Sequence, residues 1–450
     1  MTITTINPAT GEMIKEYATH ALHEIDQRIQ LLYQGWQQWK ILSFHARGQY
    51  FIAISRKLLE NKEHYAQIIT QEMGKPIQFA RSEIEKCAWI CEYFAEHAES
   101  LLQDEIIQTN LQKSFTHCQP LGVIFGIMPW NFPFWQVFRA AVTCMMAGNV
   151  FLLKHAPIST GASLAIEKLF NDVIPLTVFQ SIIVQDEAAS ALIQHPLISG
   201  VTLTGSVRAG RAVAEQAGRH IKKCVLELGG NDPYIILADA DIAMAAQRCV
   251  QSRLANAGQV CIAPKRFIVV EAIYDIFRAA VLENVENMSL QSKTLFGPMA
   301  REDLRANVHQ QVLESIAKGA KKLIGGEMPT GSGFYYPPTV LENVKPGMPA
   351  FDDEIFGPVI ALVCAKDEEE AIILANLSSY GLGAGVFTQN KEHGEYLAVN
   401  RIEAGACYVN GIVSSDPRLP FGGIKSSGMG YELGYIGMHE FVHIKTVGII

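Results

Sequence analysis

LGVIFGIM, residues 121–128, is the first of a series of short β-rich runs that decide the fold of this chain. The stretches between these runs have helix-compatible composition, as in RAGRAVAEQAGRHI at 208–221. Further runs follow at residues 149–154, 181–185, 200–206, 223–228 and 234–238. Strands that alternate with helices in this way predict βαβ units and a parallel sheet.

The same alternation continues in a second block of the chain. RFIVV (266–270) precedes a helical stretch at 272–285, and PVIALVC (358–364) precedes another at 367–377. Neither a low-complexity linker nor a repeat of fixed period separates the two blocks. The sequence therefore predicts an α/β protein with two α/β domains.

The flanking segments differ from both blocks. Residues 21–103 are predicted to be helical, because their apolar positions recur with helical spacing. Residues 104–118 alternate polar and apolar positions like a pair of strands. Together with the terminal FVHIKTVGII (441–450), they are expected to form an exposed sheet edge that needs a partner chain.

Length, composition and charge limit the classes of function. A chain of 450 residues with 49% hydrophobic and 18% charged residues is typical of a globular protein with large cores. A net charge of -8 and the lack of a basic tract argue against nucleic-acid binding. No apolar run has the roughly 18 residues needed to span a membrane, and the first residues lack the pattern of a secretory signal. Nine scattered cysteines favour a reducing cytoplasm over a disulfide framework.

The surroundings of Cys261 are unusual for a cysteine. NAGQVCIAPKR (256–266) places small or polar residues before it and a basic pair after it, whereas Cys364 lies in an apolar run typical of a packing residue. A thiolate is a strong nucleophile, and a helix start or a nearby cation favours it. Small neighbours leave room for a substrate carbon. Taken alone, the stretch is equally compatible with a loop cysteine without chemistry.

Two polar residues accompany this cysteine as catalytic candidates. Glu227 ends an apolar run before Gly229 and Gly230, where a carboxylate can face a cleft as a general base or lie solvated in a turn. Asn131 lies in the proline-bracketed PWNFP (129–133), where a fixed amide can donate a hydrogen bond to an oxyanion. The alternative is an asparagine that bonds its own turn.

Possible ligand-binding residues occur at two strand ends. Gly205 and Ser206 lie between a strand and a helix, with the composition of a phosphate-binding turn but without the spacing of a dinucleotide fingerprint. Lys154 ends another strand, where its ammonium can reach a ribose or a phosphate or remain surface-solvated. Cys87 and Cys91 are one helical turn apart, but their apolar neighbours favour core packing, so we predict no metal site.

Together and in this order, these segments resemble the NAD(P)-dependent aldehyde dehydrogenase family, from TINPATGE to HEFVHIKTV. GQVCIAPKRFIV, LKHAP and SSDPRLPFGG are similar to the short bacterial succinate-semialdehyde dehydrogenases in particular. The most specific family matches are PWNFP, LELGG, NAGQVC, EIFGPV and PFGGIKSSG. The resemblance implies a Rossmann-type cofactor domain (1–103 and 119–226), an α/β catalytic domain (227–435) and a small β oligomerisation arm (104–118 and 436–450).

The resemblance also implies a mechanism. Cys261 is then the nucleophile that attacks the aldehyde carbon, and Asn131 with the Cys261 backbone N–H holds the oxyanion. Glu227 activates the water that releases the acid from the thioester. Hydride leaves readily from such a tetrahedral adduct, which gives covalent capture its chemical purpose.

For the cofactor, NAD or NADP, the resemblance implies six residues. They are Trp130, Lys154, Gly205, Ser206, Glu354 and Phe356. One departure bears on the choice between the two cofactors. Where many NAD-preferring members have a glutamate, this chain has Pro157, so no carboxylate repels a 2′-phosphate and NADP is expected to be tolerated.

For the substrate, the resemblance implies an aldehyde with a distal carboxylate, succinic semialdehyde. Arg139 matches an arginine that binds this carboxylate in longer relatives, and Ser415 and Arg418 are further candidates. Trp135 is expected to line the aldehyde tunnel or to pack its helix. A second arginine of the longer relatives is replaced here by Ala255.

Alternative functions remain at this point. A broader medium-chain or ω-oxo-acid aldehyde dehydrogenase would share the same chemistry. A cysteine hydrolase would need a histidine base, and none of the 13 histidines falls in a matching signature. A non-catalytic relative would not need Cys261, Glu227 and Asn131 together. The resemblance further implies a homodimer or homotetramer that acts on a small aldehyde.

Overall fold

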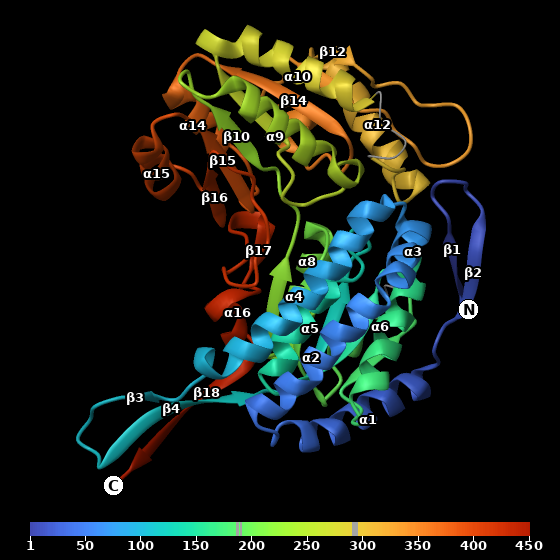
Figure 1. Cartoon of the computed structure of the whole chain (residues 1–450), viewed down its shortest axis with the longest axis vertical. Helices are drawn as coiled ribbons and strands as arrows, with labels where there is room; N and C mark the ends of the chain where they lie inside the picture. Colours follow the sequence, from blue (N-terminus) through green and yellow to red (C-terminus); the bar gives the residue numbers. More distant parts are fainter. Residues whose placement is uncertain (186–188, 190, 290–295) are drawn as a thin grey trace.

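The computed structural model describes residues 1–185, 189, 191–289 and 296–450. It consists of two lobes with a thin arm that projects from one of them (Figure 1). Each lobe contains one large sheet and its own hydrophobic core. The predicted α/β class is confirmed.

The first lobe is built on a six-stranded sheet with the order β17-β9-β8-β5-β6-β7. All neighbouring strands are parallel except β17, which runs antiparallel to β9. The strands are β5 (Val123–Met128), β6 (Val150–His155), β7 (Phe179–Ile182), β8 (Ile198–Thr204), β9 (Lys223–Glu227) and β17 (Gly428–Met429).

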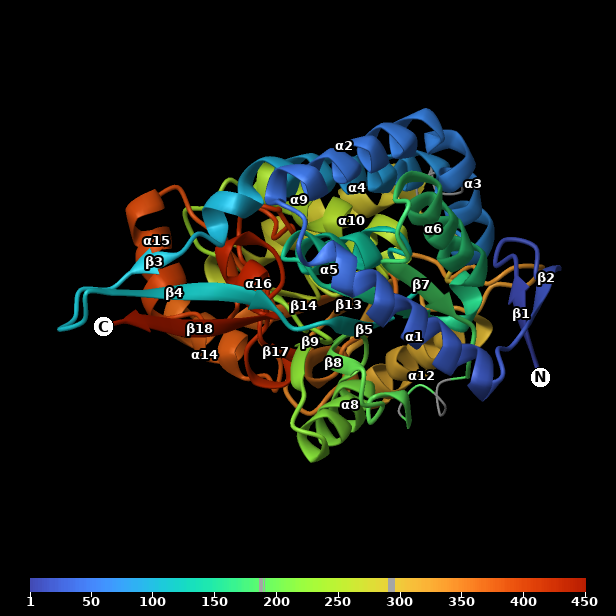
Figure 2. The same cartoon turned by 90° about the horizontal axis from the view of Figure 1, so that it is seen from below.

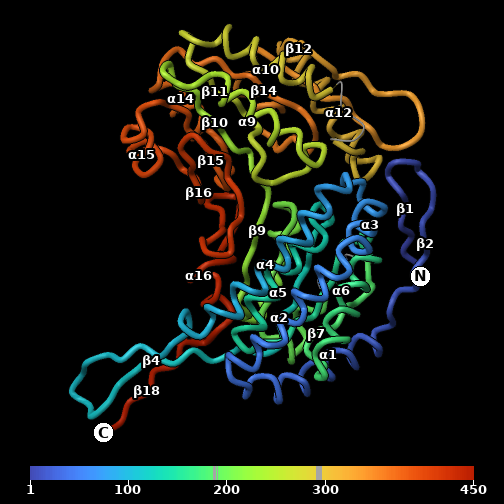
Figure 3. Tube along the Cα trace, in the orientation of Figure 1, coloured from blue at the N-terminus to red at the C-terminus, as the bar shows by residue number. Residues whose placement is uncertain are grey.

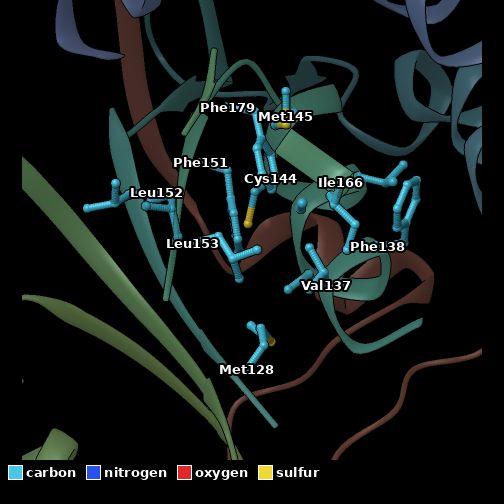
Figure 4. Packing of buried hydrophobic residues seen from close by; sticks show 14 of the residues in the cluster. Met128, Val137, Phe138, Cys144, Met145, Phe151, Leu152, Leu153, Ile166 and Phe179 are labelled. Atoms are coloured by element: carbon cyan, nitrogen blue, oxygen red, sulfur yellow. The ribbon is translucent and has the colours of Figure 1, made fainter. Parts of the chain in front are cut away.

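Helices cover this sheet, as the apolar periodicity of residues 21–103 predicts. The helices of the lobe are α1 (Leu22–Trp39), α2 (Phe44–Glu60), α3 (Lys62–Met73), α4 (Ile77–Leu101), α5 (Trp135–Met146), α6 (Thr160–Val173), α8 (Val207–Arg219) and α16 (Gly434–His439). Figure 4 shows Phe138 and Cys144 of α5 in the same core as Phe151 and Phe179. Gly126 makes this packing possible, because a Cβ there would lie 2.2 Å from the Phe151 ring.

The strand order of this sheet determines where a ligand can bind. From β5 the chain goes outward through β6 to β7 and then returns to β8 on the other side of β5. The order therefore reverses between β5 and β8, and the carboxyl ends of both strands lie at the same sheet edge. In open parallel sheets, ligands bind in the crevice at this reversal. The turns after β5 and β8 contain Asn131 and Ser206.

The chain enters the second lobe after β9 (Figure 3). Its seven-stranded sheet has the order β12-β13-β14-β11-β10-β15-β16, with only β12 antiparallel to its neighbour. The strands are β10 (Pro233–Ile236), β11 (Arg266–Val270), β12 (Lys321–Ile324), β13 (Thr339–Glu342), β14 (Val359–Ala365), β15 (Gly383–Phe387) and β16 (Ala406–Val409). The helices are α9 (Ile242–Leu254), α10 (Tyr274–Ser289), α12 (Glu302–Ala317), α13 (Pro349–Asp352), α14 (Glu368–Asn376) and α15 (Lys391–Asn400).

The projecting arm is a three-stranded antiparallel sheet with the order β18-β4-β3 (Figure 2). The strands are β3 (Glu105–Ile106), β4 (Lys113–Pro120) and β18 (Val442–Ile449). The predicted pairing of the 104–118 segment with the C-terminal strand is confirmed, with Val442 opposite Pro120 and Ile449 opposite Lys113. A separate hairpin, β1 (Thr2–Ile6) with β2 (Met13–Ala18), lies at the N-terminus.

The expectation that Cys364 packs in the core is wrong. The other side chains of β14 are buried, but Cys364 is exposed. Cys364 lies near the carboxyl end of the strand. Partial burial raises the pKa of its thiol, and the nearby carboxylates of Glu271 and Glu370 raise it further. An apolar sequence context does not ensure burial at a strand end.

Among the described residues, no helix is long and apolar enough to cross a membrane.

Candidate active site

The loop that carries Cys261 has a constrained backbone. After α9 ends at Leu254, Asn256, Ala257 and Gly258 adopt φ values of 52°, 53° and 71° in succession. Left-handed backbone is unfavourable for Ala257, so its neighbours must hold it in place. Gly258 packs so closely that a Cβ would lie 2.2 Å from the carbonyl oxygen of Gly357. The NAG sequence before the cysteine thus fits against the EIFGPV segment.

Cys261 lies where two cavities meet. One cavity of about 280 Å³ and another of about 230 Å³ both have Cys261 in their walls. Gln136 of α5 also lines both cavities. A group bound on either side can therefore reach the same thiol.

The smaller cavity lies at the strand reversal of the first sheet. It brings together Trp130 after β5, Gly205 and Ser206 after β8, and Glu354 and Phe356 from the second lobe. The Trp130 and Phe356 rings meet edge to face, with centroids 5.7 Å apart. Five of the six predicted cofactor residues therefore line one cavity.

This cavity has the features that a dinucleotide needs. Ser206 caps α8, and its hydroxyl accepts a hydrogen bond from the Ala209 backbone N–H. The N-terminus of a helix attracts phosphate, and Gly205 has no side chain to block the approach. A Cβ on Gly229 would lie 2.3 Å from Glu354, so a bulkier residue there would displace that carboxylate. The sixth predicted residue, Lys154, is buried at the end of β6 and is not part of this lining.

The larger cavity is mostly apolar with charged groups among its walls. Its apolar side chains include Phe79, Phe132, Trp135, Val413 and Phe421. Besides Trp135, two other predicted substrate residues line it. They are Arg139 and Ser415. Cavities of this composition hold small organic molecules and orient them by a few polar contacts.

The Cys261 thiol is half-buried, and burial raises its pKa to about 12. The positive charges of Arg139 and Lys265 oppose this increase without overcoming it. Lys265 Nζ donates to the Cys261 carbonyl oxygen at 2.5 Å and to that of Val260 at 3.2 Å, so it holds the loop backbone. The nearby cations favour the thiolate, as expected, but burial outweighs them, so the thiol needs a base.

Glu227 is a buried carboxyl group at the last position of β9. Burial raises its pKa well above the usual value, Arg139 lowers it and Glu432 raises it. Within the described part of the chain, Glu227 Oε1 has no hydrogen-bond partner. A carboxylate that is desolvated and incompletely bonded accepts a proton readily.

Asn131 is fixed between the two lobes. Its Nδ2 donates to the Gln259 carbonyl oxygen at 3.1 Å, and its own carbonyl accepts from Asn256 Nδ2 at 3.0 Å. One of the two amide hydrogens remains available. The backbone N–H of Cys261 also donates to no group of the described chain. These two donors have the chemistry of an oxyanion hole.

The guanidinium of Arg139 is already neutralised. It forms a buried ion pair with Glu432, donates to Thr204 Oγ1 at 3.3 Å and lies 4.7 Å from the Phe421 ring centroid. Burial lowers the pKa of Arg139, but the carboxylates of Glu432 and Glu227 raise it by more. The predicted role of Arg139 as a free clamp for a substrate carboxylate does not fit this pairing.

The other predicted substrate residues have different positions. Trp135 Nε1 donates to Ser415 Oγ at 3.1 Å inside the larger cavity. Arg418 lies outside the cavity lining, is exposed, and forms an ion pair of 2.6 Å with Asp416. Its guanidinium is 5.5 Å from the ring centroid of Trp89. The structure therefore does not bring Arg418 into the cavity lining, and its role as a substrate contact stays a prediction.

Lys86 and Gln136 are among the cavity residues that sequence reasoning missed. Lys86 on α4 donates to Ser415 Oγ at 2.8 Å and lies 4.2 Å from the Trp135 ring centroid. Gln136 follows Asn131 by five residues, and its Oε1 is buried without a partner among the described residues. The position of Gln136 beside PWNFP could have indicated it. No local pattern marks Lys86.

Neither cavity resembles a metal centre. Among the described residues, no three His, Cys, Asp or Glu side chains are grouped closely enough to hold a metal ion. Cys87 and Cys91 are both buried in the helical core of α4, and burial raises the pKa of each thiol.

Comparison with known proteins identifies the class. The profile of the aldehyde dehydrogenase family matches residues 1–447, so the chain belongs to this family. It is 44% identical to the NAD(P)+ succinate semialdehyde dehydrogenase Sad of Escherichia coli, over 98% of this chain and 96% of that one. It is 43% identical, over the full length of both chains, to a probable NADP(+) succinate-semialdehyde dehydrogenase of Synechocystis.

A solved structure agrees with this assignment. The succinic semialdehyde dehydrogenase of Streptococcus pyogenes in complex with NADP+ superposes with a TM-score of 0.96, at 33% identity and 99% coverage of both chains. The expected family and its similarity to succinate-semialdehyde dehydrogenases are confirmed.

Proposed function

We propose that this protein oxidises succinic semialdehyde to succinate with NAD or NADP, through a thioester on Cys261. The position of Cys261 in the walls of both cavities carries this proposal, because a nucleophile there can meet an aldehyde on one side and a nicotinamide on the other. The relatives named as succinate-semialdehyde dehydrogenases support the choice of substrate.

The chemistry starts at the Cys261 sulfur. Because the thiol is protonated at neutral pH, Glu227 takes its proton, directly or through water, as sulfur bonds to the aldehyde carbon. The Asn131 amide and the Cys261 backbone N–H stabilise the oxyanion of the thiohemiacetal. NAD or NADP held in the smaller cavity would supply the hydride acceptor for this adduct, and the acyl group would then remain on Cys261 as a thioester.

After it has released the thiol proton to solvent, Glu227 acts a second time, on water. Its carboxylate removes a proton from the water that attacks the thioester carbon, and the acid is released with the regenerated thiol. Because burial raises the pKa of Glu227, its carboxylate is a stronger base than that of an exposed glutamate.

We further propose that Trp130, Gly205, Ser206, Glu354 and Phe356 hold the cofactor, with Lys154 at the neighbouring strand end. Pro157 begins a short 3₁₀ turn after β6 and brings no carboxylate against a 2′-phosphate. We therefore expect NADP to be used as well as NAD, as the names of the relatives also suggest.

The remaining assignments are proposals of the same kind. Residues 1–103 and 119–226 would form the cofactor domain together with β17 and α16, which the predicted bounds 227–435 and 436–450 had given to the catalytic domain and the arm. The rest of 227–435 would form the catalytic domain. The arm, 104–118 and 436–450, would pair subunits of a homodimer or homotetramer, because its strands present unpaired edges. The protein would act in the cytoplasm, where its cysteines stay reduced.

Reduced-nicotinamide absorbance with succinic semialdehyde, under NAD and under NADP, tests the activity. Mass spectrometry of protein stopped during turnover should show a succinyl adduct on Cys261. A Cys261→Ala variant should lack both, whereas a Cys364→Ala variant, which removes an exposed thiol outside both cavities, should retain both. Full turnover by Cys261→Ala would refute the mechanism.

The same assay separates the alternatives. Equal efficiency with uncharged aldehydes would favour the broader medium-chain enzyme, and equal efficiency with longer ω-oxo acids would favour the ω-oxo-acid enzyme. Ester hydrolysis that needs neither nicotinamide nor Glu227 would favour a cysteine hydrolase. Cofactor binding without turnover of any aldehyde would favour a non-catalytic relative.

A further inference from the structure

The larger cavity contains one cation, Lys86, that forms no ion pair with any described residue. Of the three charged side chains in its lining, Glu83 forms an ion pair with Lys75 and accepts from the Phe134 and Trp135 backbone N–H groups. Arg139 is paired with Glu432, as described above. Lys86, the third, has no carboxylate within 4.0 Å in the described part of the chain.

The surroundings of Lys86 favour an anion beside it. The side chain is half-buried, and its ammonium lies over the Trp135 ring and donates to Ser415 Oγ. Asp416, whose charge raises the pKa of Lys86, is already paired with Arg418. A partly desolvated ammonium that faces an apolar cavity gains stability when an anion pairs with it.

Ser415 supplies a second donor at the same place. Its oxygen accepts hydrogen bonds from both Lys86 Nζ and Trp135 Nε1, at 2.8 and 3.1 Å. Both acceptor positions of the hydroxyl are then occupied, so its O–H must donate elsewhere. The described chain offers it no acceptor, which leaves the cavity as the direction for this donor.

We propose that Lys86 and Ser415 bind the distal carboxylate of the substrate, at a subsite in the cavity that also contains Cys261. This inference rests on the proposed oxidation of succinic semialdehyde and names the residues that select it. Lys86 supplies the charge, Ser415 supplies a hydroxyl donor, and Trp135 orients both. Arg139 serves a different purpose, since its charge is used within the protein.

Kinetics with paired aldehydes test the subsite. Butanal has the four-carbon chain of succinic semialdehyde without the carboxylate. The ratio of kcat/KM for succinic semialdehyde to that for butanal should fall by about 10- to 100-fold in Lys86→Met, the range for losing a hydrogen bond to a charged group. Lys86→Arg keeps the charge and should recover much of the ratio.

A matched control variant is available in Lys40→Met. The Lys40 ammonium also lies over a tryptophan ring, 4.3 Å from the centroid of Trp36, and is half-buried, but it is outside the cavity lining. The ratio should stay at the wild-type value in this variant. An unchanged ratio in Lys86→Met, or an equal fall in both lysine variants, would overturn the subsite.

The pH dependence gives a readout that a structural role would not produce. Burial, and then Arg139, lower the pKa of Lys86 to about 8, against the opposing effects of Cys87, Asp416 and Glu83. The ammonium is therefore lost as pH rises through about 8, and kcat/KM for succinic semialdehyde should fall there relative to butanal. Lys86→Arg should move this fall to higher pH. A ratio that does not depend on pH would count against the proposal.

Binding of succinate distinguishes failure of the subsite from failure of the proposed function. Succinate should quench or shift tryptophan fluorescence in the wild type, because Trp135 is in the subsite, and should bind more weakly to Lys86→Met. If no aldehyde is oxidised but succinate binding depends on Lys86, the proposed function is wrong and the subsite stands. If succinic semialdehyde is oxidised and succinate binds both proteins equally, the subsite is wrong.

Discussion

Replacing Arg139 with methionine should destabilise the protein and slow its chemistry without favouring uncharged substrates. Arg139 and Glu432 are 2% and 4% exposed, so the change leaves a carboxylate buried without its partner. Breaking a buried ion pair from one side costs about 3–5 kcal/mol. The free energy of unfolding should decrease by about this amount.

The size of this loss should depend on pH. Burial raises the pKa of Glu432 and Arg139 opposes that increase, so removing Arg139 raises the pKa further. A group whose pKa is higher in the folded state than in the unfolded state loses stabilisation as pH rises. Arg139→Met should therefore be closest to wild type in mild acid and weakest above neutral pH. Adding Glu432→Gln should restore part of the stability, as in a double-mutant cycle.

The catalytic effect follows from the same charge. Arg139 lowers the pKa of both Glu227 and Cys261, so its removal leaves less of the base and the nucleophile ionised. Denaturation curves at pH 6 and pH 8, with kcat/KM for succinic semialdehyde and butanal, measure both effects. Both substrates should lose rate by a similar factor. A fully stable variant that loses only the charged substrate would show that Arg139 is the carboxylate clamp and that the pairing reasoning is wrong.

Two further predictions concern the reacting groups. Asn131→Ala should lower kcat by about 100- to 1,000-fold, because one donor to the oxyanion is lost. Cofactor affinity, measured by fluorescence titration, should change little. A loss in kcat below threefold would exclude the amide from the oxyanion hole. Glu227→Gln removes the base from both steps, so stopped-flow traces should show slower first-turnover formation of reduced nicotinamide as well as slower release of the acyl adduct. Because burial raises the pKa of Glu227, wild-type kcat should increase with pH as the carboxylate ionises, and an increase that persists in Glu227→Gln must come from another group.

The sequence predicted well the features that depend on local pattern. β9 ends at Glu227, and the turns after β5 and β8 hold Asn131 and Ser206, because strand ends and their turns have recognisable composition. Carboxyl ends of parallel strands share one sheet edge, so residues distant in the chain come together there. The alternating pattern of the 104–118 segment likewise indicated an arm strand.

The charge partners could not be predicted in this way. Lys86 and Ser415 are in contact although they are 329 positions apart in the chain. Arg139 and Glu432 are also far apart, because the sequence of the second lobe lies between them. Lys86 has the pattern of a solvated helix residue, since nothing nearby in the sequence indicates that a later loop covers it. For Arg418 the family resemblance predicted a substrate contact, whereas in the structure its guanidinium forms an ion pair with Asp416, two residues away in the sequence.

The large sequence separation between the paired strands of the arm has a consequence for biosynthesis. β4 is synthesised early, but the strand that covers one of its edges, β18, comes more than 300 residues later. At about 5–20 residues per second, a ribosome leaves that edge open for on the order of half a minute. Nascent chains should therefore be vulnerable to edge-to-edge association during translation, and a C-terminal truncation should extend this exposure for the life of the protein.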